Sequence, residues 1–97
     1  MSITNYQPLD APWTQRTVLI SGEGKGAWTY ARLADSAEAL GTRKAVRVRA
    51  TVDGHETEVT LLPMGDGDHM FPMKATLRAS TDTSAGDAVA ITITHRD

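Results

Sequence analysis

The 97-residue sequence predicts a mainly β fold with two short helices, arranged as one small β-barrel domain. Short runs of β-branched residues recur along the chain and are separated by Gly, Pro and Asp, which is typical of strands joined by turns. Only two segments carry helix signals, a cap and a stop for the first and an opening proline for the second. The length leaves room for a single core, because a chain of this size buries only about 60–65% of its unfolded surface. We place an N-terminal arm at residues 1–14 and the barrel domain at residues 15–97.

The N-terminal segment carries no strand pattern. Residues 1–12 contain two prolines and no apolar periodicity, so we expect an arm that is loosely held unless Tyr6 or Trp13 fixes it. The segment lacks the basic and apolar regions of a signal peptide, and no stretch reaches the ~20 apolar residues that a membrane span requires. We therefore expect a cytoplasmic protein that does not enter membranes.

Two strands are expected to form a hairpin at the start of the domain. The first, residues 16–21, is rich in β-branched residues and ends at a glycine-rich turn, residues 22–26. The second, residues 27–33, carries Trp28 and Tyr30 at alternate positions, so both side chains are expected on one face of the strand.

A two-turn helix is predicted next. Asp35 or Ser36 is expected to cap it, the helix runs through Leu40, and Gly41 ends it. The strand that follows, residues 43–53, alternates more regularly than any other segment. Its expected inward-facing residues are Val46, Val48, Ala50 and Val52.

Asp53-Gly54 predicts a type I′ hairpin turn, because both central residues of that turn need a positive φ. The returning strand is expected at residues 57–62, with Val59 and Leu61 on one face. A polar loop at residues 63–68 follows, and residues 69–71 form a short strand.

A second short helix is expected to open at Pro72 and to run to about Ser80. The turn residues Gly86-Asp87 then begin the last strand, residues 88–94. Its expected inward-facing residues are Val89, Ile91 and Ile93.

The order strand, turn, strand, helix, strand occurs twice along the chain, first from Gly26 to Val48 and again from Gly67 to Ile91. Each half alone would leave open sheet edges and an uncovered apolar face. This repetition predicts a small barrel with pseudo-twofold symmetry.

The composition limits the possible functions. Because the chain has no cysteine, it has no disulfide, thiolate metal site or cysteine nucleophile. The formal net charge is −2, so we do not expect nucleic acid to bind the molecule as a whole. The basic strand at residues 43–49 is the natural face for DNA, but Glu56 and Glu58 lie on the neighbouring hairpin. The sequence contains no phosphate-binding loop, nucleophile elbow or paired carboxylates.

The candidate site centres on His69, Lys74 and Arg78. His69 is a possible acid or base, since imidazole titrates near neutral pH. Lys74 and Arg78 are four residues apart and would share a helical face, so both could hold an anion. The structural alternative, which we favour, is that His69 packs at a seam of the barrel and that the two cations are solvated.

Trp28 and Tyr30 are candidates for stacking on an organic ligand. The alternative, which is the commoner role for such a pair, is core or dimer surface. Asp66 and Asp68 precede His69 in one loop and carry groups that metals prefer, but the spacing fits no calcium or zinc motif. We interpret this loop as a tight polar turn and expect neither a metal nor a cofactor.

Residues 62–74, followed by Arg78 and Gly86-Asp87, resemble the bacterial family called domain of unknown function 1905. The segments around Trp28 and Gly54 also fit that family, so the resemblance covers most of the chain. It implies a double-split β-barrel, the architecture also found in the AbrB and MazE transcription-factor domains. The chain departs from the family pattern at residues 79–84, where a polar segment replaces a Leu-Gly-Leu helix end.

Together these observations favour a binding or interaction module with a site around Trp28, His69, Lys74 and Arg78. The ligand is expected to be small and organic or anionic. Two alternatives remain open: a barrel enzyme that acts on an organic metabolite with His69 as acid or base, and a weak AbrB-like DNA-binding regulator. The sequence does not decide between a monomer and a homodimer.

Overall fold

The computed structural model describes residues 6–22 and 28–97. Within these residues the chain forms a mainly β fold with two short helices, as the sequence predicts. The elements are β1 (Gln7–Val18), β2 (Ile20–Ser21), β3 (Thr29–Leu33), α1 (Ser36–Leu40), β4 (Val46–Val52), β5 (His55–Pro63), β6 (His69–Pro72), α2 (Ala75–Thr81) and β7 (Ala88–Arg96).

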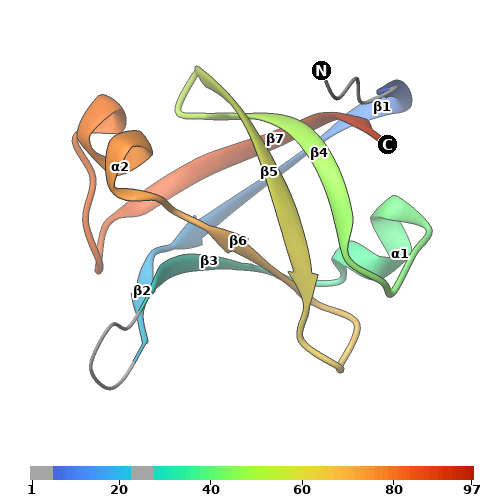
Figure 1. The fold of residues 1–97 in the computed structure, drawn as a ribbon, viewed down its shortest axis with the longest axis horizontal. Coiled ribbons are helices and arrows are strands. Elements are labelled where there is room, and N and C mark those ends of the chain that lie inside the picture. The colour runs from blue at the N-terminus through green and yellow to red at the C-terminus, as the bar shows by residue number, and fades with distance from the viewer. Residues whose placement is uncertain (1–5, 23–27) are drawn as a thin grey trace, which may run out of the picture.

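The strands form one curled antiparallel sheet in the order β1-β7-β4-β5-β6-β3-β2, which gives the domain the shape of a half-barrel (Figure 1). The two helices lie at opposite sides of the sheet, with α2 beside the start of β7 and α1 beside the start of β4. The unit strand, helix, strand occurs twice, as β3-α1-β4 and β6-α2-β7. The corresponding strands of the two units pair with each other, β3 with β6 and β4 with β7.

Strand β1 is longer than its sequence pattern indicates. It pairs with β7 at Gln7 and Pro8 and again from Trp13 to Val18, with a register shift between these two stretches, and so crosses the boundary that we placed between residues 14 and 15. The expected arm is therefore held in part by pairing with β7, which the absence of a strand pattern in this segment did not predict. Both proposed anchors also make contacts. The Tyr6 hydroxyl donates to Glu58 over 3.2 Å, and Trp13 packs against the core.

The predicted hairpin between residues 16–21 and 27–33 is confirmed only where Ile20-Ser21 pairs with Thr29-Tyr30. The first strand breaks at Leu19, which is buried and exchanges backbone hydrogen bonds with the turn before β7. Residues 23–27, which contain most of the predicted turn, lie outside the described residues.

The core confirms the predicted alternation of the long strands. The predicted inward-facing side chains of β4, β5 and β7 are all buried, each at most 4% exposed, and they pack with Phe71 and Leu33 from the short strands. The Asp53-Gly54 turn is also as predicted, since φ is 47° at Asp53 and 86° at Gly54. One polar side chain pair, Ser36 and His69, is buried with this core.

Helix α1 ends as predicted, at Gly41 with a φ of 73°, but it begins differently. Asp35 is the N-cap residue, yet neither it nor Ser36 caps the helix through its side chain. Asp35 adopts a left-handed conformation without a side-chain cap bond, and the Ser36 hydroxyl bonds to His69 instead. The cap prediction was therefore right in position and wrong in mechanism.

Helix α2 begins three residues later than predicted, because Pro72 is the last residue of β6 and Lys74 is the N-cap. It ends at Thr81, where Asp82 takes the left-handed conformation that closes a helix. The Thr81 hydroxyl donates to the Leu77 carbonyl over 2.9 Å, so the polar residues close the helix in place of an apolar end. Neither helix in the described part of the chain has the length and apolar character needed to cross a membrane.

Candidate functional site

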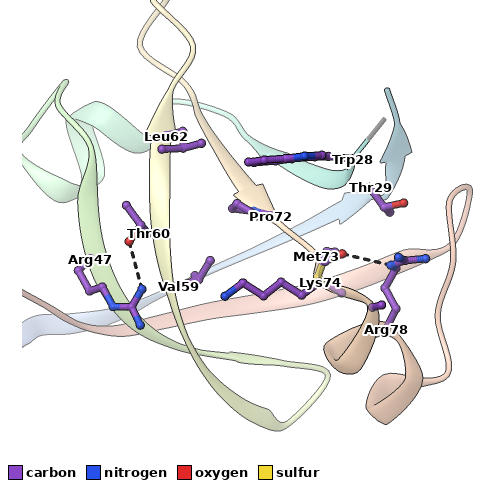
Figure 2. A pocket seen from close by; sticks show the side chains of 11 residues that line it. Trp28, Thr29, Arg47, Val59, Thr60, Leu62, Pro72, Met73, Lys74 and Arg78 are labelled. Carbon is purple, nitrogen blue, oxygen red and sulfur yellow. Dashed lines mark hydrogen bonds between the residues drawn. The ribbon is translucent and has the colours of Figure 1, made fainter. Parts of the chain in front are cut away.

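A groove of about 510 Å³ opens between the start of α2, the middle of β5 and the segment that leads into β3 (Figure 2). This volume is in the range of small-molecule sites, which is roughly 300–1,000 Å³. The groove brings together three of the predicted site residues, Trp28, Lys74 and Arg78. Its further described lining is Thr29, Arg47, Val59, Thr60, Leu62, Pro72, Met73 and Ala75.

Trp28 forms one side of the groove and is 56% exposed. It stands just before β3, where its carbonyl accepts a hydrogen bond of 2.8 Å from the Gly22 backbone N–H. Figure 2 shows the indole edge-on, with Pro72 and Lys74 below one of its flat faces. The aromatic face is therefore available to a ligand.

Three cationic side chains line the groove, and their positions are fixed by the fold. Arg47 on β4 donates from Nη1 to the Thr60 hydroxyl over 3.1 Å. Arg78 on α2 donates from Nε to the Met73 carbonyl over 3.1 Å. Lys74, the N-cap of α2, extends its side chain along the groove toward β5 (Figure 2).

The described residues of the groove include no carboxylate that would neutralise these cations. The salt bridges between described residues involve Arg32 and Arg49 and not Arg47, Lys74 or Arg78. The groove is therefore a positively charged surface in a protein whose net charge is −2. An anion is the charge-complementary ligand.

His69 lies outside the groove. It is fully buried, Nδ1 is 2.7 Å from the Ser36 hydroxyl, and Nε2 is 2.9 Å from the Lys44 carbonyl. Because a carbonyl can only accept, Nε2 carries the proton, and in the neutral ring Nδ1 accepts from Ser36. Neither nitrogen is free to exchange a proton with a molecule in the groove. The geometry gives His69 the structural role of joining α1, the start of β4 and β6.

Tyr30 also lies outside the groove lining. It is half-buried on β3, where its backbone is paired between Ile20 and Pro72. Of the predicted aromatic pair, the structure thus brings only Trp28 to the cations.

The loop that carries Asp66 and Asp68 is held by Arg32 from β3. Arg32 Nε donates to Asp68 over 2.7 Å, and the same guanidinium bonds to Asp66. The other Asp68 oxygen accepts a 3.0 Å hydrogen bond from the Asp35 backbone N–H, at the start of α1. This backbone hydrogen bond, followed by the bond from Arg32, lowers the pKa of Asp68 below its ordinary value.

These contacts support the interpretation of the loop as a polar turn. The imidazole of His69 is turned to Ser36 and Lys44, so it does not join the two carboxylates. Among residues 6–22 and 28–97, no group of three or more His, Asp or Glu side chains is arranged to hold a metal ion.

The basic strand at residues 43–49 does not present one continuous positive face. Arg47 turns into the groove, whereas Arg49 bonds to Glu58 over 3.2 Å and stacks on Tyr6 with 4.8 Å between guanidinium carbon and ring centre. Glu58 lies directly opposite Arg49 in the β4–β5 register. Part of the charge that favoured a DNA face is therefore neutralised within the sheet.

Arg47 and Thr60 are site residues that the sequence analysis did not single out for the groove. They lie opposite each other in the β4–β5 register, and the predicted hairpin could have placed them together. Nothing in the sequence pattern shows that α2 packs beside this strand pair, which is what turns Arg47 into part of a site.

The fold and the groove define a small β domain with a solvent-open, positively charged site. A model of the family described as domain of unknown function DUF1905 matches residues 16–93. The chain belongs to this family, as the resemblance at residues 62–74 indicates. A search of curated proteins finds no match.

Proposed function

We propose that this domain is a binding module that holds a small organic or anionic ligand in the groove beside α2. The observation that carries the proposal is the meeting of Trp28 with Arg47, Lys74 and Arg78 around one groove. These side chains come from three separate segments of the chain, the residue before β3, strand β4 and the start of α2, so their convergence depends on the fold. Binding sites commonly combine an apolar lining with a few placed polar groups in this way.

The enzyme alternative receives less support. That alternative assigned proton transfer to His69, and His69 is buried outside the groove with both nitrogens bonded. The described lining contains neither a carboxylate nor a histidine. A binding role requires only the groove that is present.

The DNA-binding alternative also receives less support, because Arg49 is paired with Glu58 and Arg47 turns into the groove, so the basic strand does not present a continuous positive face. Proteins that follow a phosphate backbone present a longer positive surface.

We further propose that the curled sheet is completed as the double-split barrel that the family resemblance implies. The two edge strands, β1 and β2, are consecutive in the chain and are separated only by Leu19. The Gln15 side chain on β1 exchanges hydrogen bonds of 2.8 and 3.0 Å with the Ala34 backbone just beyond β3. Thr17 donates to the Arg32 carbonyl over 3.2 Å. Side chains thus bridge β1 to the β3 segment where no backbone pairing joins them.

A thermal-shift screen of a library of small organic compounds tests the binding proposal, because a ligand that binds the folded state raises the unfolding temperature. Compounds that stabilise the unaltered protein should lose this effect on Trp28→Ala and keep it on Arg49→Ala, a change on the same strand as Arg47 but outside the groove. Equal stabilisation of both variants, or no active compound in the library, would argue against the groove as a binding site.

A further inference from the structure

The groove presents an aromatic surface and positive charges on different sides. Figure 2 shows the Trp28 indole along one side, above Pro72, and the Lys74 side chain extended below it toward the strands that carry Val59 and Arg47. A flat molecule stacked on the indole would therefore direct one edge toward the cations.

The cations keep most of their hydrogen-bonding capacity. A guanidinium has five N–H donors, and Arg47 and Arg78 each use one of them in the described bonds, to Thr60 and to Met73. These bonds also orient both guanidinium groups before any ligand arrives, which reduces the entropy that binding costs. A ligand with a charged acceptor makes stronger hydrogen bonds to such donors than a neutral ligand does.

The apolar part of the groove requires a ring or a comparable flat apolar group. Leu62 and Pro72 lie beside Trp28, and the Met73 side chain is buried beneath the groove. Aromatic rings prefer offset stacking on an indole and gain further from the apolar area they cover. An inorganic anion would leave this surface exposed.

From this arrangement we infer that the groove selects a planar aromatic molecule with one anionic group, a carboxylate, sulfonate or phosphate. Its ring lies against Trp28 and its anionic group lies beside Lys74. The inference rests on the proposed binding function and specifies the ligand class. Next to the groove, Arg49 is paired with Glu58, so the positive surface does not continue along β4 from Arg47, and this favours a small molecule over an extended polyanion.

Two dyes with the same aromatic system test the inference. Anilinonaphthalene sulfonate carries one sulfonate, and N-phenylnaphthylamine is its uncharged counterpart; both become more fluorescent in an apolar site. We expect saturable, one-to-one binding of the sulfonate and binding of the neutral dye that is weaker by about tenfold or more, because a charge-assisted hydrogen bond is lost. Methanesulfonate, an anion without a ring, should fail to displace the bound dye at millimolar concentration.

Substitutions in the groove test which side chain contacts the aromatic ring of the ligand and which contacts its anionic group. Lys74→Ala should lower the affinity for the sulfonate dye by about tenfold and leave the affinity for the neutral dye unchanged. Trp28→Ala should lower the affinity for both dyes. Trp28→Phe should restore most of the binding, since phenylalanine also offers a flat face. Arg49→Ala is the matched control and should bind both dyes as the unaltered protein does.

The outcomes separate the ligand class from the binding function. Equal affinity for the two dyes, with both weakened by Trp28→Ala, would overturn the anionic requirement and leave the groove as a binding site. Displacement by methanesulfonate would overturn the aromatic requirement. If neither dye binds, or if Trp28→Ala and Lys74→Ala change nothing, both the ligand class and the proposed groove function fail.

Discussion

The two helices occupy corresponding places in the repeated strand, helix, strand unit, but their surroundings differ. Helix α1 buries Ser36 and Leu40 and is joined to the rest of the domain by the hydrogen bonds of His69. Helix α2 has no fully buried residue and leaves a charged groove beside it. One copy of the unit thus buries part of its helix in the fold, and the other leaves its helix nearer the surface, beside the groove.

Polar contacts reinforce this difference. At the α1 end, Arg32 holds the loop of Asp66 and Asp68, and Arg96 from β7 donates to the last carbonyl of the helix, that of Leu40. At the α2 end, the Arg78 side chain bonds, among the described residues, only within its own segment, to the carbonyl of Met73. The comparison indicates that charged residues at the α1 end stabilise the fold and that those at the α2 end are available for binding.

The largest expected effect on stability comes from removing the leucine that packs each helix against the core, Leu40 on α1 and Leu77 on α2. Leu40→Ala should lower the free energy of unfolding by about 2–5 kcal/mol, because it leaves a cavity in the closed core. Leu77→Ala on α2 should cost at most about half as much, because Leu77 is only partly buried. Urea unfolding of the two variants measures both values, and equal losses would contradict the proposed difference between the helices.

The next effect concerns His69. His69→Ala should lower the free energy of unfolding by about 2–4 kcal/mol, since it removes a buried ring and leaves the Ser36 hydroxyl and the Lys44 carbonyl without partners. His55→Ala, at an exposed position, is the matched control and should change stability by no more than about 0.5 kcal/mol. A stable His69→Ala protein that has lost ligand binding would instead support a role in the site.

A pH dependence is expected from Asp68. Its pKa is lower in the folded protein than its ordinary value of 3.8, so the ionised form adds stability above that pH. This stability is lost as the pH falls below 3.8 through the folded-state pKa. The stability difference between the unaltered protein and Asp68→Asn should be constant near neutral pH and should shrink in this acidic range. Urea unfolding at a series of pH values measures it, and a difference that grows on acidification would reverse the assignment.

The smallest expected effect on stability is at the groove. Lys74→Ala should change the free energy of unfolding by no more than about 0.5 kcal/mol, because Lys74 is exposed and does not enter the salt bridges of the described residues. The same urea experiment applies. A loss above 1 kcal/mol would assign Lys74 a structural role.

The sequence predicted the strands well where period-two alternation fixes a buried face, as in β4 and β7. It missed the first half of β1, because residues 7–12 show no alternation and the pairing of Gln7 and Pro8 with β7 is a contact distant in sequence. It also placed the start of α2 too early. Proline is compatible with both a strand end and a helix start, and Pro72 takes the first.

For the site, residue type singled out Trp28, Lys74 and Arg78 as ligand-binding candidates, and the fold brings all three to one groove. It did not separate His69 from them, because a histidine next to a polar loop has the same sequence signal whether its ring is buried or open. Ser36, whose hydrogen bond holds the His69 ring in the interior, is 33 residues away in the chain. Likewise, the β4–β5 register places Arg47 opposite Thr60, but it points to a site only once α2 is known to lie beside these two strands.

One measurement tests the contrast between the two helix ends directly: backbone-amide NMR shifts during titration with anilinonaphthalene sulfonate. The account predicts saturable changes at Thr29, Thr60, Met73 and Ala75, which line the groove, and none at Ser36 or Leu40 in α1. Changes centred on α1, or changes spread evenly over the domain, would contradict the assignment of the binding surface to the α2 end.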